Sequence, residues 1–229
     1  MRRENAGYAL TRRALNDLDD GVTNFFRVLQ DPDKSNELHR KLLVTPYSER
    51  EFLDARKTWK TCEDAVEKAR LWFINIRQSW GGLLKGGFGY MKSPKKTKSS
   101  SVVQPLLSAI DRLPLCSERL RRCQIFNRDF REIISLFDTS NTFFYLDPPY
   151  VHSTRKTKSD YQHEMTEDDH IELVERLLEL KGKAMLSGYA NPIYGALECA
   201  GWERVDIDWQ TKMSKKDTKR IETLWIKYW

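Results

Sequence analysis

Four apolar residues, Phe143 to Leu146, run directly into Asp147-Pro148-Pro149-Tyr150, and this junction constrains the fold more than any other part of the sequence. Proline has no backbone N–H to give to a sheet ladder, so two successive prolines end a strand and fix the backbone behind it. In open α/β sheets, functional groups collect at the carboxyl ends of strands. The sequence therefore predicts that Asp147 and Tyr150 stand at such an edge.

Strand and helix patterns alternate along the rest of the chain. Residues 14–19 predict a strand end that runs into polar residues, and further strands are expected near 123–126, 141–146 and 183–186. Helices are expected over 22–29, 105–111, 166–180 and 192–200, with another that follows residues 127–130 and runs through 136. Long helical patterns from Ser48 to Gln78 predict two helices, and Ser48-Glu49-Arg50-Glu51 resembles a capping box. This alternation predicts an α/β fold with a doubly wound, mostly parallel sheet, and residues 202–208 and 222–229 predict an antiparallel hairpin at its edge.

The composition limits the classes of partner and site. Lys and Arg outnumber Asp and Glu by 39 to 33, which favours a polyanionic partner without requiring one. The four cysteines form no Cys-x-x-Cys pair and the few histidines lack zinc-ligand spacing, so we expect neither a metal site nor a disulfide framework. No apolar run approaches the roughly 18 residues of a membrane span, and no secretory segment follows the charged start, so we expect a cytoplasmic protein.

The Asp-Pro-Pro-Tyr junction suits chemistry on a planar amine. A carboxylate beside an outward carbonyl is a good acceptor pair for an exocyclic NH₂ group, and the Tyr150 ring offers a stacking face for a base. The alternative interpretation is a proline-stiffened turn that carries a surface tyrosine.

The sequence around this junction resembles a known family. The pieces FFYLDPPYV and LSGYANPIYGALECAGW, within residues 141–202, are similar to the catalytic half of the Dam-type (D12 class) adenine-specific DNA methyltransferases. Similarity continues in ALNDLDDGVTNFFRVLQ, LLVTPYSEREF, RQSWGGLLKGGFGY, FNRDF and KRIETLWIKYW, and so spans almost the whole chain in the family's order. The resemblance implies a Rossmann-like methyltransferase sheet with a helical target-recognition lobe, and transfer of methyl from S-adenosylmethionine to N6 of an adenine flipped out of double-stranded DNA.

The resemblance also implies roles for individual residues. Asp147, Pro148, Pro149 and Tyr150 would hold the target adenine, with Asp147 also beside the cofactor. Asp17 would bind the ribose hydroxyls of S-adenosylmethionine, although an exposed turn aspartate or helix cap is the competing reading. Asp129 and Phe130 would lie beside the cofactor's adenine, whereas a helix N-cap followed by a core phenylalanine is nearly as well supported.

A glycine-punctuated basic segment, Gly81 to Ser101, occupies the place where the family carries its target-recognition elements. The cations expected to contact DNA in and beside it are Arg77, Lys85, Lys92, Lys95, Lys96 and Lys98, although isolated lysines are more often plain solvated surface. We accordingly expect a partial cofactor-binding part at 1–45, a recognition lobe at 46–104 and a catalytic part at 105–229.

The chain departs from the family at its start. Family members begin with a lysine- and glycine-bearing segment and a Phe-x-Gly-x-Gly-like loop that wraps the cofactor, whereas Met1 to Thr11 contains only Gly7. We expect a truncated, phage-derived form with reduced activity, unless another polypeptide, a second copy or an upstream start supplies the missing part. The alternatives are a non-catalytic DNA-binding remnant and methylation of RNA adenine or of a protein glutamine amide.

Overall fold

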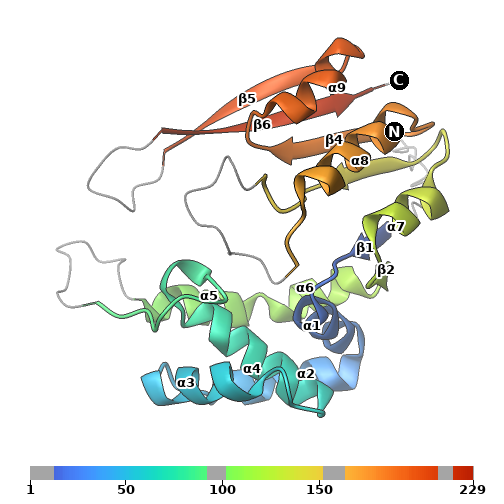
Figure 1. The fold of residues 1–229 in the computed structure, drawn as a ribbon. Coiled ribbons are helices and arrows are strands. Elements are labelled where there is room, and N and C mark those ends of the chain that lie inside the picture. Colours follow the sequence, from blue (N-terminus) through green and yellow to red (C-terminus); the bar gives the residue numbers. More distant parts are fainter. Residues whose placement is uncertain (1–12, 92–101, 152–162, 211–218, 229) are drawn as a thin grey trace, which may run out of the picture. The chain divides into compact units, whose positions relative to one another are not determined.

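The computed structural model describes residues 13–91, 102–151, 163–210 and 219–228 (Figure 1). The chain divides into two compact units, Met1–Arg128 and Asp129–Trp229. The first unit is mainly helical with one short pair of strands, and the second is built on a four-stranded sheet.

Six α-helices make up most of the described part of the first unit. Their core contains fully buried side chains, including Leu38, Leu42 and Ile74, and α4 packs against α1, α2 and α3. Gly21 lets α1 approach α4 closely, because a Cβ atom there would lie 2.3 Å from the Trp72 ring. The elements, in chain order, are β1 Arg13–Asn16, α1 Asp20–Gln30, α2 Pro32–Leu43, α3 Glu49–Thr58, α4 Ala65–Arg77, α5 Val103–Asp111, α6 Leu113–Leu120 and β2 Cys123–Phe126.

Local capping residues explain where the first helices begin. The Asp19 carboxylate accepts the N–H groups of Gly21 and Val22 at the start of α1. Asp31 ends α1 and caps α2, and Pro32 follows at the position where a helix needs no N–H donor. The chain therefore turns from α1 directly into α2, a helix that the sequence patterns did not predict.

Strands β1 and β2 pair in parallel, with Leu15 opposite Ile125. Side chains fasten the two strand ends together. The Asn16 amide donates to the Arg128 carbonyl at 2.8 Å and accepts the Arg128 N–H, while the Asn127 amide donates to the Asp17 carbonyl at 2.7 Å. These contacts hold the backbone at Asp17 beside the loop that follows β2.

The described part of the basic segment, Gly81 to Met91, is held in place by contacts with the helices of the first unit. Phe88 packs against Tyr47 and Phe52 with ring centroids 5.3 and 5.8 Å away, and the Tyr47 hydroxyl donates to the Gly89 carbonyl at 2.6 Å. Gly81 adopts a φ of 72°, in the left-handed region that favours glycine. The glycines therefore shape a turn, the glycine turn of residues 81–91, that packs on the helices of the first unit.

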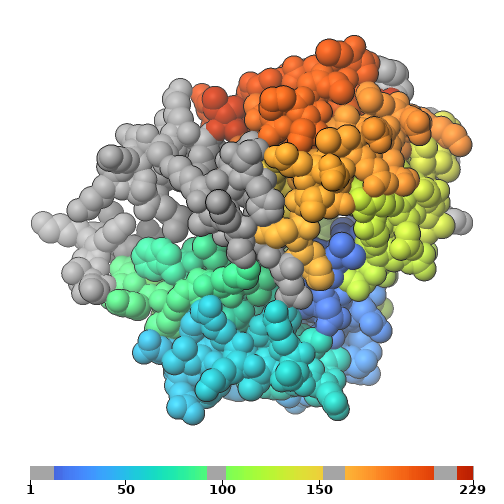
Figure 2. All heavy atoms as spheres, viewed as in Figure 1, coloured from blue at the N-terminus to red at the C-terminus, as the bar shows by residue number. Residues whose placement is uncertain are grey.

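The second unit carries a sheet in the order β3-β4-β6-β5 (Figure 1). Strands β3 and β4 are parallel, whereas β6 is antiparallel to both of its neighbours. Phe144, Leu146 and Leu186 contribute to the core of this unit. Helices α8 and α9 lie across one face of the sheet in Figure 1, and the orange atoms of this part of the chain form that face of the unit in Figure 2. The elements are α7 Phe130–Phe137, β3 Phe143–Leu146, α8 Glu167–Leu178, β4 Lys183–Gly188, α9 Gly195–Cys199, β5 Glu203–Gln210 and β6 Lys219–Lys227.

The mixed α/β class and the antiparallel C-terminal hairpin are confirmed, but one doubly wound sheet is not seen among the described residues. Their strands form two sheets, and none of them pairs with the second edge of β1 or of β3. Phe143 and Tyr145 lie on the same face of β3, because successive side chains of a strand alternate, and they are 57% and 61% exposed. The three functional segments expected from the sequence stay a prediction, since the division into units assigns no roles.

Two further properties concern only the described residues. None of the helices there is long and apolar enough to cross a membrane. No group of three or more His, Cys, Asp and Glu side chains is arranged there to hold a metal ion.

Candidate functional site

Asp147 leaves the end of β3 with its carboxylate held from the neighbouring strand. Ser187, in β4, lies 2.9 Å from Asp147 Oδ1 and 3.2 Å from the Leu146 carbonyl, and its hydroxyl can donate to either. Ser187 is 1% exposed, whereas Asp147 is exposed. One side of the carboxylate is thus fixed by a buried hydroxyl while the residue stays open to a ligand.

Tyr150 is oriented by a carboxylate on a third strand. Its hydroxyl donates to Glu222 Oε1, in β6, at 2.6 Å. Its ring meets the Tyr189 ring edge-on, with centroids 4.6 Å apart and an interplanar angle of 67°. A charge-assisted hydrogen bond and an aromatic contact together restrict the plane that Tyr150 presents.

The strand pairing brings these groups together although they are far apart in the chain. Parallel pairing places Leu146 beside Leu186, so the residues that follow them, Asp147 and Ser187, become neighbours. Ser187 in turn pairs with Leu224 on β6, two residues from Glu222. The arrangement offers a fixed carboxylate, a proline-stiffened backbone and two aromatic rings, which suit a planar ligand with an NH₂ group.

Asp17 stands just beyond β1 and is exposed. Its Oδ1 accepts the Asp19 N–H at 2.8 Å, and Asp19 rather than Asp17 caps α1. Of the competing readings, Asp17 is therefore a turn aspartate at a strand end and not the helix cap. Its exposed carboxylate is compatible with ribose hydroxyls, and that role stays a prediction.

The side chains of Asp129 and Phe130 make their contacts with other residues of the second unit. Asp129 caps α7 by accepting the Arg131 N–H at 2.8 Å, and its carboxylate also lies 3.0 Å from the Arg131 guanidinium. The same guanidinium sits over the Phe130 ring, 4.5 Å from its centroid, and Phe130 packs against the core. These contacts match the reading of a cap followed by a core phenylalanine, while the cofactor role remains untested.

Arg131 is the centre of an ion-pair cluster that joins α7 to α8. It also binds Asp169 and Glu172, and this pairing raises the pKa of Arg131. The hydrogen bond from Arg131 is the main cause that lowers the pKa of Asp169 to about 2, and it also lowers the pKa of Glu172. The cluster stays charged at neutral pH and fixes the start of α7.

The cations expected to contact DNA are described only in part. Arg77, at the end of α4, is exposed with its guanidinium 5.6 Å from the Phe73 ring centroid, and Lys85 is exposed in the glycine turn. Trp80 and Tyr90 are 56% and 54% exposed in the same stretch of chain. The remaining candidates, Lys92, Lys95, Lys96 and Lys98, lie outside the described residues.

Sequence reasoning missed three groups of the site around Asp147: Ser187, Tyr189 and Glu222. The signal for two of them was present, since Ser187 and Tyr189 belong to the LSGYAN piece that follows an apolar strand pattern. Glu222 carried no local signal, because only the register of β6 on β4 brings it to Tyr150. Trp80 and Tyr90 were likewise not singled out beside the basic residues.

Comparison with known proteins matches most of this chain, including the residues around Asp147, to one protein family. The family model described as D12 class N6 adenine-specific DNA methyltransferase matches residues 5–213, which include Asp17, the glycine turn, Asp147 to Tyr150 and Ser187. No individual curated protein matched the chain.

Proposed function

This chain belongs to the D12 class N6 adenine-specific DNA methyltransferases, and from that premise we propose that it methylates N6 of an adenine flipped out of double-stranded DNA. The observation that carries the proposal is the geometry at Asp147 and Tyr150. A carboxylate held by Ser187 and a ring held by Glu222 stand at the end of one strand. They provide the acceptor and the stacking surface that an extruded adenine needs.

In the proposed reaction, Tyr150 stacks on the flipped base while the Asp147 carboxylate and the Pro148 carbonyl accept hydrogen bonds donated by the N6 amino group. When bound, S-adenosylmethionine supplies an electrophilic methyl group. These hydrogen bonds orient the nitrogen and raise its electron density. Asp147 is also placed to accept the proton that N6 loses when it gains the methyl group. Positioning and fixed electrostatics would therefore carry most of the rate enhancement.

The turn at residues 81–91 and its surroundings support a nucleic acid as the carrier of the adenine. Arg77 and Lys85 provide positive charge on the same unit as the exposed rings of Trp80 and Tyr90. Cations position phosphates, and exposed aromatic rings offer stacking surfaces for bases. A substrate such as a peptide amide would use the chemistry at Asp147 without needing this combination.

The proposed cofactor contacts differ in how well the residues fit them. Asp17 is exposed and compatible with ribose hydroxyls, whereas the Asp129 carboxylate is engaged by Arg131 and one face of Phe130 is covered by the same side chain. Cofactor adenine could use those two residues only after Arg131 moved. We accordingly propose that this chain binds S-adenosylmethionine weakly and transfers methyl at a reduced rate.

A non-catalytic DNA-binding protein is the second candidate, and the position of Arg131 favours it. Such a protein would keep the glycine turn and the Tyr150 site without holding the cofactor. Calorimetric titration with S-adenosylmethionine separates the two, since an enzyme must show saturable binding and a remnant must not.

The test of the main proposal is product identification. The chain is incubated with labelled S-adenosylmethionine and, in parallel, with adenine-containing duplex DNA, RNA of the same sequence and a glutamine peptide. We expect N6-methyladenine in the duplex DNA alone, identified by mass spectrometry after digestion. Label in the RNA or the peptide alone would refute the assignment of the substrate, and no label with any of them would favour the second candidate.

A further inference from the structure

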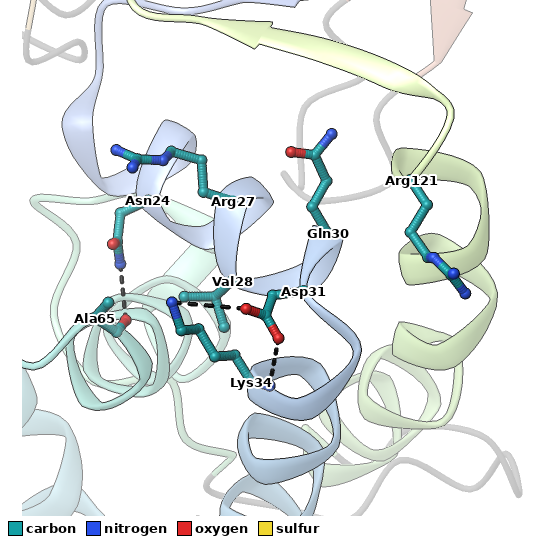
Figure 3. Close-up of a pocket in the computed structure, with 8 residues that line it drawn as sticks. All are labelled: Asn24, Arg27, Val28, Gln30, Asp31, Lys34, Ala65 and Arg121. Atoms are coloured by element: carbon teal, nitrogen blue, oxygen red, sulfur yellow. Dashed lines mark hydrogen bonds and ion pairs between the residues drawn. The ribbon is translucent and has the colours of Figure 1, made fainter.

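A hollow on the first unit lies where the ends of α1 and α6 meet the starts of α2 and α4 (Figure 3). Its volume is about 510 Å³, within the range of roughly 300 to 1,000 Å³ common for small-ligand pockets. Its lining residues are Asn24, Arg27, Val28, Gln30, Asp31, Lys34, Ala65 and Arg121. Asp17 precedes the first turn of α1, whereas Arg27 lies in the last, so this hollow is separated from Asp17 by most of a helix that spans roughly 16 Å.

Side-chain amides tie the walls of the hollow together. The Asn24 amide, on α1, donates to the Ala65 carbonyl at the start of α4, at 3.0 Å. The Gln30 amide donates to the carbonyls of Leu120 and Cys123, at 3.0 and 2.6 Å, and so links the end of α1 to the end of α6. Three elements from distant parts of the chain are thus fixed around one space, which is a preorganised arrangement.

The charges at the hollow are unbalanced. The lining contains three cationic residues, Arg27, Lys34 and Arg121, and one carboxylate, that of Asp31. Asp31 already accepts the N–H groups of Asp33 and Lys34 and lies 3.7 Å from the Lys34 ammonium, and these contacts, led by the Lys34 N–H, lower its pKa. Asp31 therefore stays ionised and is satisfied locally, which leaves the two arginines without compensation from it.

No other described carboxylate neutralises the two arginines. On the elements that form the hollow, Asp20 pairs with Lys68, Glu67 with Arg70 and Glu118 with Arg122. Arg27 and Arg121 are exposed, and within the described part of the chain neither of their side chains makes a hydrogen bond or an ion pair. Arginine presents a planar fork of donors that matches phosphate oxygens, so this pair is suited to anions of that kind.

The positions of the cations indicate the shape of the anion. In Figure 3 the side chains of Arg27 and Arg121 lie on opposite sides of the hollow with their guanidinium groups pointing away from each other, and Lys34 and Val28 lie lower, between them. One isolated phosphate could not contact both arginines as they stand. A ligand that bears several phosphate groups along its length could, because successive groups would meet successive cations.

We propose that this hollow is a second, non-catalytic binding site for a chain of phosphate groups, held by Arg27 and Arg121. The phosphates come either from the backbone of a nucleic acid or from a free oligophosphate, and the chemistry of recognition is the same. The site needs neither S-adenosylmethionine nor methyl transfer, so it can be tested whether or not the proposed function holds.

The test compares the full chain with the double variant Arg27→Gln/Arg121→Gln. Calorimetry measures binding of inorganic triphosphate, and fluorescence anisotropy measures binding of a labelled short duplex at several salt concentrations, both without S-adenosylmethionine. Arg40→Gln is the matched control, because Arg40 is also exposed and in the last turn of a helix, yet does not line the hollow. Melting curves confirm that each variant is folded, and the single variant Arg121→Gln replaces the double one if that one is not.

We expect the double variant to lose roughly a hundredfold in affinity for at least one ligand, about tenfold for each charge-assisted contact, with the control within about twofold of the unaltered chain. Loss for triphosphate alone identifies a free oligophosphate as the ligand. Loss for the duplex, with a salt slope lower by ~0.9 for each phosphate contact removed, identifies the nucleic-acid backbone. Unchanged affinity for both ligands, or an equal loss in Arg40→Gln, would overturn the proposal.

Discussion

The hydrogen bond from Tyr150 to Glu222 should determine how well the Tyr150 ring receives a base, and Tyr150→Phe removes that bond while keeping the ring. The two oxygens are 2.6 Å apart and both side chains are half-buried. Hydrogen bonds to charged groups contribute about 1.5 to 3 kcal/mol, and partial exposure favours the lower end. If half or more of that energy orients the ring during transfer, kcat/KM should fall roughly three- to tenfold.

The assay is a double-mutant cycle on methyl transfer to duplex DNA, with Tyr150→Phe, Glu222→Gln and the two combined. Because both single changes disrupt one interaction, the combined variant should lose little more than either alone. Tyr145→Phe is the matched control, since it removes a hydroxyl from the exposed tyrosine of β3 five residues earlier. Additive losses in the combined variant, or an equal loss in Tyr145→Phe, would refute the reasoning.

Three other changes test neighbouring parts of the account. Ser187→Ala removes the buried donor to Asp147 and should lower kcat roughly tenfold with little change in duplex affinity, whereas a loss seen only in melting temperature would make Ser187 merely structural. Arg131→Gln should lower the melting temperature most above pH about 4. The difference in melting temperature between the variant and the unaltered chain should shrink as the pH falls through the Asp169 pKa of about 2, because a carboxyl group with a lowered pKa stabilises the fold only while it is ionised. A difference that stays constant with pH would contradict this. Gly21→Ala should destabilise the chain by about 1 to 3 kcal/mol in urea unfolding, because its Cβ would meet the Trp72 ring, and no loss would mean that the ring moves aside freely.

Features that depend on neighbours in the sequence were predicted best. The Asp-Pro-Pro-Tyr turn does end a strand, and the helix expected from residue 166 does begin there, where Thr166 and Asp169 form a capping box. Ser48 occupies the N-cap position of α3 as expected, but its side chain makes no capping hydrogen bond, and its backbone N–H donates to Gln78 instead. The local sequence thus predicted the start of the helix correctly, while the hydrogen-bond partner of the Ser48 N–H lies 30 residues away in the chain.

Features that depend on strand register or on distant charges could not be read from the sequence. Ser187 and Glu222 lie 40 and 72 residues from the groups they hold, and only the pairing of three strands brings them there. From the sequence, Asp129 could be a helix cap or a cofactor ligand; the structure shows that it caps α7 and pairs with Arg131, which also binds Asp169 of α8, and the cofactor role stays a prediction. Helix α2 escaped notice because few of its residues are apolar, although Leu38 and Leu42 are fully buried.

The most direct test of the central claim is methyl transfer by Asp147→Ala beside the unaltered chain, with labelled S-adenosylmethionine and adenine-containing duplex DNA. The account predicts that the unaltered chain forms N6-methyladenine and that the variant forms none above background. The melting temperature should remain close to that of the unaltered chain, because Asp147 is exposed. Turnover by Asp147→Ala at the rate of the unaltered chain would contradict the assignment of the catalytic site.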